Sequence, residues 1–145
     1  MWIDVKYEPG TVKVVAYDDN GKVAEEKEIR TAGQPYQIVL DADRKTITAD
    51  GEDISFVTVS VVDKNGVPCP TATNQLKFKV SGAGTYRAAC NGDATSLEMF
   101  HKDTMKLFSG KLVVLVKSKT TAGDIKLEVN GAGLKAGKLT LEAKK

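Results

Sequence analysis

The side chains that could take part in chemistry gather in one stretch of the chain, CNGDATSLEMF at residues 90–100. Asp93 and Glu98 are the carboxylates that a hydrolase could use as an acid and base pair. Nothing in the sequence places these two groups on opposite sides of a cleft. Short polar side chains in such a stretch more commonly bond to their own backbone. We therefore assign no catalytic residue, and we keep as candidate contacts to carbohydrate or to an interface Asn91, Asp93, Thr95 and Glu98.

A nucleophilic triad is the second chemistry that this stretch could suggest. Ser96, His101 and Asp103 have the right residue types, but the sequence has no GxSxG turn, and the three lie too close together to converge. Another possible motif, Gly82-Ala83-Gly84, is followed by a strand pattern and not by a helix, so it predicts a turn and not a phosphate-binding loop.

Aromatic side chains near the start of the chain could stack on sugars. Trp2, Tyr7, Tyr17 and Tyr36 would form such a platform if they converged. Packing between two parts of the chain is the more common use of aromatic residues at such a boundary. We keep Trp2 and Tyr7 as candidate contacts to carbohydrate or to an interface.

Metal and redox chemistry find little support. Asp41, Asp43 and Asp50 lack the dense oxygen spacing of a calcium loop. Cys69, Cys90 and the one histidine are too few for a zinc site, so we expect no metal and no cofactor. The two cysteines could form one disulfide if their strands are neighbours, and two free, mostly buried thiols are the plainer alternative.

Charge and hydropathy exclude further classes. Lys and Arg total 21 against 19 acidic residues, a net charge of +2 that predicts no nucleic-acid partner. No apolar run is long enough for a membrane span. The first residues lack a basic start and an apolar stretch, which predicts either a cytoplasmic chain or a piece of a longer precursor.

The strongest local pattern occurs twice. An alternating apolar run followed by an Asn-Gly turn appears at 11–21 and again at 54–66, and this combination is typical of β-hairpins. Around the first copy we expect three short strands, at 2–6, 11–17 and 22–30. The small-residue segment 31–35 follows as a hinge and as the best domain boundary. Three strands cannot make a sandwich, so residues 1–33 resemble the closing end of a domain whose other strands are missing.

Residues 34–145 contain a complete set of strands. The spacing predicts a first strand split between 36–40 and 46–49, and a long central strand with two apolar faces at 54–63. Further strands are expected at 76–81, 86–89, 111–117, 124–129 and around 139–141, whereas 97–108 is ambiguous. Seven or eight short strands at this spacing predict an immunoglobulin-like β-sandwich in an all-β chain. Because the three strands of 1–33 would expose unpaired edges, they should pack on this domain or pair with a second copy.

Three stretches resemble a known family. WIDVKYEPGTVKVVAY at 2–17 resembles the end of an immunoglobulin-like domain in bacterial β-galactosidases of glycoside hydrolase family 2. The segment 40–70 is similar to invasin-type repeats and closer still to the C-terminal domain of these enzymes. The most specific match joins Asn91–Phe100 to Phe108–Val114.

The resemblance implies a non-catalytic C-terminal region of a β-galactosidase that retains configuration. The family's catalytic residues lie on a barrel of about 250 residues that this sequence lacks. Expected partners are that barrel, neighbouring domains of the parent chain, a second copy in a homodimer, or carbohydrate. The alternatives are a carbohydrate-binding module and an adhesin-like cell-surface module. The resemblance also implies a periplasmic or secreted parent, and the location of this chain itself stays open.

Overall fold

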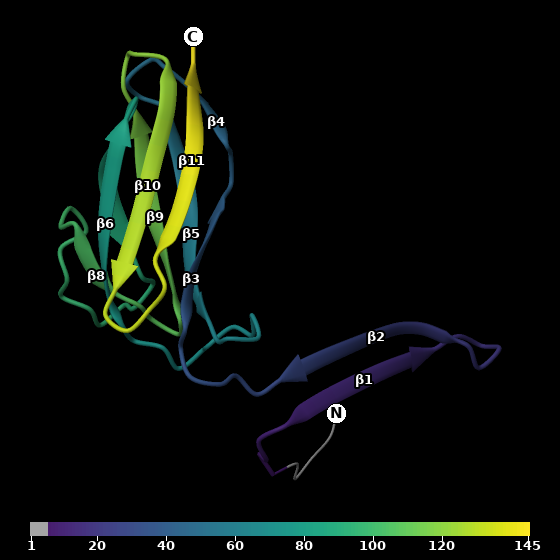
Figure 1. The fold of residues 1–145 in the computed structure, drawn as a ribbon. Coiled ribbons are helices and arrows are strands. Elements are labelled where there is room, and N and C mark those ends of the chain that lie inside the picture. Colours follow the sequence, from purple (N-terminus) through teal and green to yellow (C-terminus); the bar gives the residue numbers. More distant parts are fainter. Residues whose placement is uncertain (1–5) are drawn as a thin grey trace.

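The structure is a computed structural model that describes residues 6–145, and its regular elements are strands (Figure 1). The described part holds no helix that could cross a membrane. Its strands are, in chain order, β1 Thr11–Tyr17, β2 Val23–Arg30, β3 Gln37–Ala42, β4 Thr46–Thr48, β5 Ile54–Val62, β6 Gln75–Gly82, β7 Gly84–Cys90, β8 Thr104–Lys106, β9 Lys111–Ser118, β10 Gly123–Gly131 and β11 Gly137–Lys144.

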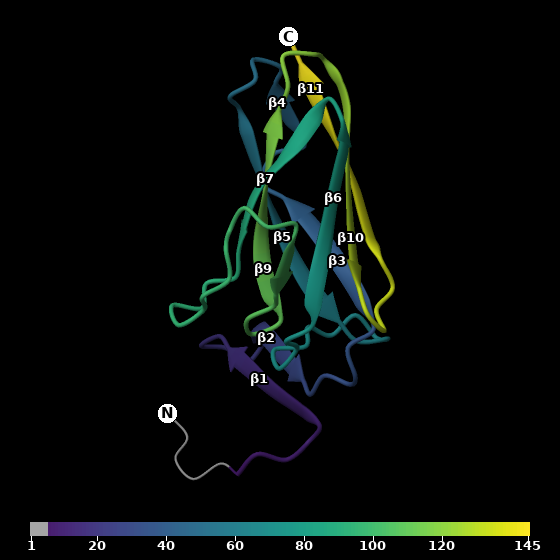
Figure 2. The same cartoon turned by 90° about the vertical axis from the view of Figure 1, so that its left-hand side faces the viewer.

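Two sheets face each other and enclose the core (Figures 1 and 2). One has the order β4-β11-β10-β6-β8 and the other the order β3-β5-β9-β7. Strands with alternating apolar residues turn one side inward, so the core is built from residues such as Val59, Leu76, Val114 and Leu127. This arrangement confirms the predicted all-β fold and its immunoglobulin-like sandwich.

The split first strand crosses from one sheet to the other. β3 pairs antiparallel with β5, whereas β4 pairs parallel with β11 in the opposite sheet. The break at residues 43–45 is where the chain changes layers, so the interruption seen in the sequence closes one edge of the sandwich.

β5 is central in its sheet, with β3 on one side and β9 on the other. The sequence predicted this central position from two apolar faces, both expected to be buried. That reason was wrong, because only one face of β5 is covered. Val57, Val59 and Val61 are fully buried, while Phe56 on the other face is 47% exposed. β5 is therefore a half-buried antiparallel strand, as is usual when one side of a sheet faces water.

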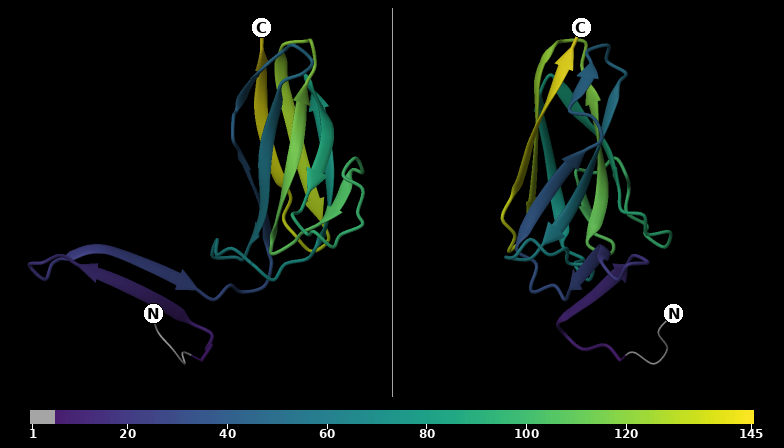
Figure 3. Two further views of the ribbon diagram at one scale, coloured as in Figure 1. Left: turned by 180° about the vertical axis from the view of Figure 1, so that it is seen from behind. Right: turned by 90° about the vertical axis from the view of Figure 1, so that its right-hand side faces the viewer.

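β1 and β2 form a separate two-stranded sheet that extends from one end of the sandwich, opposite the C-terminus (Figures 1 and 3). The two strands are exposed along almost their whole length. The expectation that they pack on the complete domain is therefore wrong. The third strand expected before them, 2–6, lies almost wholly outside the described residues.

The two Asn-Gly turns have the same local structure. In each turn, the side chain of an aspartate accepts hydrogen bonds from the backbone N–H groups two and four residues later. Asp18 accepts from Asn20 and Lys22, and Asp63 accepts from Asn65 and Val67. The glycines have φ of 76° and 81°, a conformation that favours glycine. Only the first turn starts a long hairpin, since the second leads to a single bridge between Val62 and Pro68.

Candidate functional site

The segment between β7 and β9 forms an open depression of about 460 Å³ in the surface of the sandwich. The structure brings together three of the candidate contact residues, Asn91, Asp93 and Glu98, with Ser96 from the triad considered above and with the exposed ring of Phe108. Thr95 does not line the depression. A cavity of this size is large enough for a small ligand.

Both carboxylates of the depression already accept hydrogen bonds, Asp93 from its own loop and Glu98 from residues of β6 and β8. Both Glu98 oxygens accept the backbone N–H of Lys106, at 3.2 and 3.1 Å, and Oε1 also accepts from Gln75 Nε2 at 3.3 Å. Asp93 Oδ1 accepts the hydroxyl and the N–H of Thr95, at 2.7 and 2.9 Å. The bond from the Thr95 hydroxyl has the larger effect and the bond from the Thr95 N–H the smaller, and both lower the pKa of Asp93 below its usual value. This carboxyl is therefore not an acid held ready to donate a proton.

A tyrosine ties the same loop to the sandwich. The Tyr86 hydroxyl on β7 donates to the backbone carbonyl of Phe100 at 3.0 Å, and it also contacts the carbonyl of Lys102. Its ring stacks on Phe78, with centroids 5.7 Å apart. Burial, assisted by the charge of Asp103, raises the pKa of Tyr86 to about 12, so the hydroxyl stays a donor. The loop thus has a fixed backbone although Leu97 is 97% exposed.

Residues of the suspected triad do not converge on one another. The Ser96 hydroxyl accepts the Glu98 N–H at 3.2 Å, and Asp103 pairs with Lys77 at 3.8 Å. His101 is exposed. These contacts fix the loop and the neighbouring strand, and they give no route for a proton from serine to histidine.

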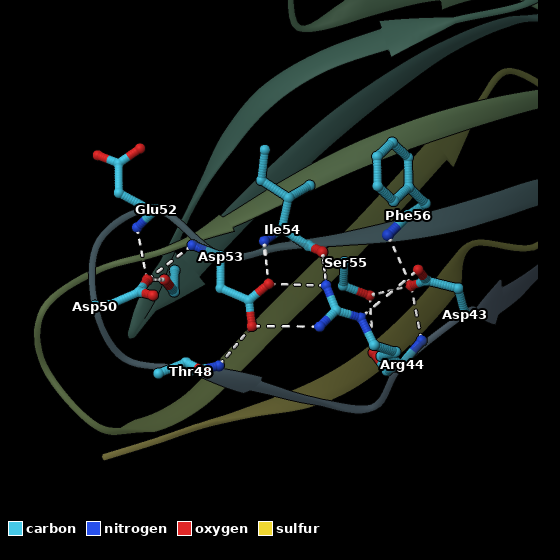
Figure 4. Close-up of polar contacts among 10 residues, drawn as sticks. Asp43, Arg44, Thr48, Asp50, Glu52, Asp53, Ile54, Ser55 and Phe56 are labelled. Atoms are coloured by element: carbon cyan, nitrogen blue, oxygen red, sulfur yellow. Dashed lines mark hydrogen bonds and ion pairs between the residues drawn. The ribbon is translucent and has the colours of Figure 1, made fainter.

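A denser polar cluster lies where the chain changes sheets (Figure 4). Arg44 donates to both oxygens of Asp53, at 2.8 and 3.4 Å. The Asp53 carboxylate also accepts the N–H groups of Thr48 and Ile54, at 2.8 Å each. The Thr48 bond first, and then Arg44, lower the pKa of Asp53 to about 2. The cluster stabilises the loops around β4 and β5.

Two of the three aspartates considered for calcium serve this cluster instead. Asp43 Oδ1 accepts from Arg44 N–H, Ser55 Oγ and Phe56 N–H, and Asp50 Oδ1 accepts from the N–H groups of Glu52 and Asp53 (Figure 4). Asp41 is exposed on β3. Across residues 6–145, no three side chains of metal-binding type come together.

The aromatic platform is not present in the described part of the chain. Tyr7 is 77% exposed and donates to Thr31 Oγ1 at 3.4 Å, while Tyr17 lies at the far end of β1. Tyr36 has the Lys64 ammonium 5.7 Å from its ring centre. Trp2 lies outside the described residues. The interpretation of these rings as packing between two parts of the chain is therefore wrong for the three that the structure describes.

The cysteines are both free: Cys69 is buried and Cys90 is exposed. Burial first, and then the nearby charge of Asp63, raise the pKa of Cys69. The free-thiol alternative is therefore confirmed, but its expectation of buried thiols is wrong for Cys90. Cys69 acts as a small apolar core residue.

The connection between hairpin and sandwich is a contact that the sequence did not reveal. The backbone N–H of Gly33 donates to Asp63 Oδ2 at 2.8 Å, and the Gly33 carbonyl accepts from Cys69 Sγ at 3.7 Å. Asp63 is only 4% exposed, and the Gly33 bond first lowers its pKa. The repeated Asn-Gly pattern predicted a turn here, but it gave no indication that the second carboxylate oxygen of Asp63 would bind the linker.

Comparison with known proteins gives two family matches. The model described as glycoside hydrolase family 2 C-terminal domain 5 matches residues 38–140. A second model, described as a domain of unknown function (DUF4982), matches residues 1–25. The two matches leave residues 26–37 between them, a stretch that includes most of β2 and the segment that joins the hairpin to the sandwich.

Individual relatives are much longer than this chain. It is 45% identical to the β-galactosidase BoGH2A of Bacteroides ovatus over 96% of its length, which is 16% of that protein. A solved family 2 member from Bacteroides cellulosilyticus superposes with a TM-score of 0.91 and 30% identity, over 97% of this chain and 18% of that one. The D00-D0 domain of intimin, at 18% identity and a TM-score of 0.54, shares the fold alone.

Proposed function

The chain belongs to the glycoside hydrolase family 2 C-terminal domain 5 family, and we propose that it is a non-catalytic accessory region of a longer β-galactosidase-like enzyme. The observation that carries this proposal is the superposition on the family 2 member from Bacteroides cellulosilyticus, in which the matching residues make up 18% of the chain. The parent enzyme would hydrolyse β-galactosides or related β-glycosides with retention of configuration, in the periplasm or outside the cell.

The hydrogen bonds of the depression support a structural role. A glycosidase needs one carboxyl that can donate a proton and a second carboxylate across the scissile bond. The Asp93 carboxylate instead accepts the N–H and hydroxyl of Thr95 in its own loop, and the Glu98 carboxylate accepts the backbone N–H of Lys106 on β8. The catalytic groups of the parent are then supplied by another part of the polypeptide.

Within this role, we divide the chain into two units. Residues 1–33 are the last strands of a preceding immunoglobulin-like domain, and residues 34–145 form the complete C-terminal sandwich. The separate sheet of β1 and β2 and the two family matches support this division. The sandwich would brace the parent enzyme or take part in its dimer interface.

A comparison of activities tests the proposal. The isolated chain should give no signal with a chromogenic β-galactoside, whereas the full protein encoded by the same reading frame should hydrolyse it. Truncating the full protein after residue 33 should lower its thermal stability more than its turnover per folded molecule. A reading frame without a glycosidase domain would refute the assignment.

Carbohydrate binding is the rival function, and the depression beside Phe108 is the observation in its favour. A polar hollow next to an exposed aromatic ring is the arrangement in which sugars stack and form hydrogen bonds. Against it, the side-chain groups of Asn91 are bound to Lys106 carbonyl and Asp93 N–H, which leaves fewer free partners for hydroxyls. Titration of the chain with galacto-oligosaccharides tests carbohydrate binding. If the chain binds them and Phe108→Ala abolishes the binding, the rival function is favoured.

The adhesin-like alternative has the fold of intimin as its support, and that likeness extends to fold alone. Tandem copies of this sandwich in the reading frame, with no hydrolase domain, would favour it over an enzyme accessory.

A further inference from the structure

Four of the five asparagines of the chain are followed by a glycine: Asn20, Asn65, Asn91 and Asn130. An asparagine in this position can modify itself, because the backbone nitrogen of the next residue can attack its side-chain carbonyl carbon. Glycine favours the attack, since it has no side chain that would shield the nitrogen. Two of the four pairs form the tight turns after β1 and β5, so the structure decides which pairs can react.

The reaction needs water and no other reagent. The glycine N–H gives its proton to a base, its nitrogen bonds to asparagine Cγ, and the Cγ–Nδ2 bond breaks. Nδ2 leaves as ammonia with that proton, and a cyclic imide remains. Water then opens the imide at either of its carbonyls, which yields aspartate or isoaspartate with no oxidation or reduction. A side chain that is held by hydrogen bonds, or an N–H that is bonded elsewhere, must be released before the attack.

Two of the pairs are held within the sandwich. The Asn91 side chain is fixed at both ends, since Nδ2 donates to the Lys106 carbonyl at 3.1 Å and Oδ1 accepts the Asp93 N–H at 3.0 Å. Asn130 and Gly131 are paired with β6 at the end of β10. Both asparagines are therefore able to react only when part of the sandwich opens.

The two turn pairs share their local bonds but differ in how the turn is held. The Gly21 N–H donates to the Asp18 carbonyl at 3.0 Å, and the Gly66 N–H donates to the Asp63 carbonyl at 3.1 Å. Asp18 is exposed, whereas Asp63 is only 4% exposed and its Oδ2 also accepts the Gly33 N–H at 2.8 Å. We call this contact of Asp63 with Gly33 the anchor. It ties the second turn to the sandwich, and the first turn has no such contact among the described residues.

Asn20 lies in the turn of the β1–β2 hairpin, at the end that points away from the sandwich (Figures 1 and 3). Both strands are exposed along almost their whole length, and their register is irregular at this same end, between Ala16 and Tyr17. A two-stranded hairpin is only marginally stable in water, so its turn opens at a small cost in free energy. Opening releases the Gly21 N–H from its acceptor and leaves the exposed Asn20 side chain free to approach it.

We propose that Asn20 is a self-modification site, at which the folded chain converts asparagine into isoaspartate and aspartate, whereas the sandwich protects the other three Asn-Gly pairs. The new carboxylate lies next to Asp18 and Asp19, and like charges at such short range repel each other. Isoaspartate also lengthens the backbone within the turn, so the two N–H groups no longer match the Asp18 carboxylate. Conversion therefore loosens the hairpin and leaves the sandwich intact.

Incubation at mildly alkaline pH followed by peptide mass mapping tests the site, since base removes the proton from the attacking nitrogen. In the folded chain, Asn20 should convert about tenfold or more faster than each of the other three asparagines. Asn20→Gln should remove the fast product, because attack on the longer side chain closes a less favourable ring. Equal conversion of Asn20 and Asn65 in the folded chain would overturn the proposal.

The chain unfolded in guanidinium chloride is the control for sequence effects. All four pairs should then convert at similar rates, because the glycine that follows is common to them and no folded structure restrains them. If Asn20 keeps the same lead in the unfolded chain, the lead comes from its sequence neighbours, and the structural assignment fails.

The anchor gives a matched test on the second turn. Asp63→Asn removes one carboxylate oxygen and should raise the conversion of Asn65 about tenfold. Asn91 in the same sample reports whether the sandwich stays folded, since it speeds up only when the sandwich opens. If this variant does not fold, Asp18→Ala, which alters only the exposed hairpin, should raise the conversion of Asn20 and leave Asn65 slow. An unchanged rate at Asn65 in a folded Asp63→Asn chain, or at Asn20 in Asp18→Ala, would contradict the protection assigned to these turn bonds.

Discussion

Arg44 and Asp53 form a two-point ion pair at the end of the sandwich where the chain passes from β3 to β4, with Nη2–Oδ1 at 2.8 Å and Nη1–Oδ2 at 3.4 Å (Figure 4). The same carboxylate receives two backbone N–H groups, so it organises a loop as well as an ion pair. When Asp53 takes up a proton in the folded chain, it therefore weakens both its ion pair with Arg44 and its hydrogen bonds from the two backbone N–H groups.

Acid should weaken the sandwich through Asp53. Its pKa is about 2 when folded, against an ordinary value of 3.8. Between these pH values the unfolded chain binds more protons than the folded chain, so stability is lost as pH falls from about 4 to 2. Asp53→Asn should reduce this loss and lower stability at pH 6, as measured by urea unfolding. The exposed Asp41→Asn should keep the dependence of the parent chain, and a parent chain that is insensitive to pH in this range would contradict the prediction.

Gly110 is required by its position next to β9. Its φ is 73°, and a Cβ there would lie 2.1 Å from the Cys69 carbonyl oxygen. Gly110→Ala should cost more than about 3 kcal/mol, because left-handed strain adds to a backbone clash. Gly92, with φ of 79° and open space around it, is the matched control, and Gly92→Ala should cost about 1 kcal/mol. Denaturant unfolding measures both, and similar losses would contradict this reasoning.

The two cysteines should react very differently. Cys90 is exposed and Cys69 is 2% exposed with a raised pKa. Because thiolate and access both control reactivity, an aromatic disulfide reagent should modify one thiol quickly in the folded chain and the second only after unfolding. Cys90→Ser should remove the fast phase. If two thiols react quickly in the folded chain, the assignment of Cys69 as buried is contradicted. If neither thiol reacts until a reductant is added, the assignment of both cysteines as free is contradicted.

The parts of the fold that the sequence predicted are those governed by local rules. Apolar patterns placed β5, β9 and β10 to within about two residues of their true ends, by alternation in β5 and β10 and by a continuous apolar run at 112–116 in β9. The Asn-Gly signal located both tight turns, since these require a residue that accepts positive φ.

What the sequence missed depends on contacts between distant residues. The change of sheet between β3 and β4, the route of the loop that contains Leu97, and the binding of Gly33 by Asp63 all join segments far apart in the chain. Of the candidate residues, Asn91, Asp93 and Glu98 were found to line one depression. Their hydrogen bonds were foreseeable for Asn91 and Asp93, whose partners Asp93 and Thr95 are each two positions away, and not for Glu98, whose partners lie on β6 and β8.

The Tyr86 hydroxyl should account for the order of the loop that borders the depression. It donates to the Phe100 carbonyl, which also accepts the Ala89 N–H at 2.8 Å, so one carbonyl joins the loop to β7 twice. Tyr86→Phe keeps the ring stacked on Phe78 and should cost about 1 kcal/mol, the usual net worth of one hydrogen bond. Exchange of the Ala89 amide should rise in this variant, whereas Tyr17→Phe, on the exposed hairpin, should change neither quantity. An unaltered Ala89 amide in Tyr86→Phe would mean that the loop is held by the Glu98 bonds to Lys106 instead.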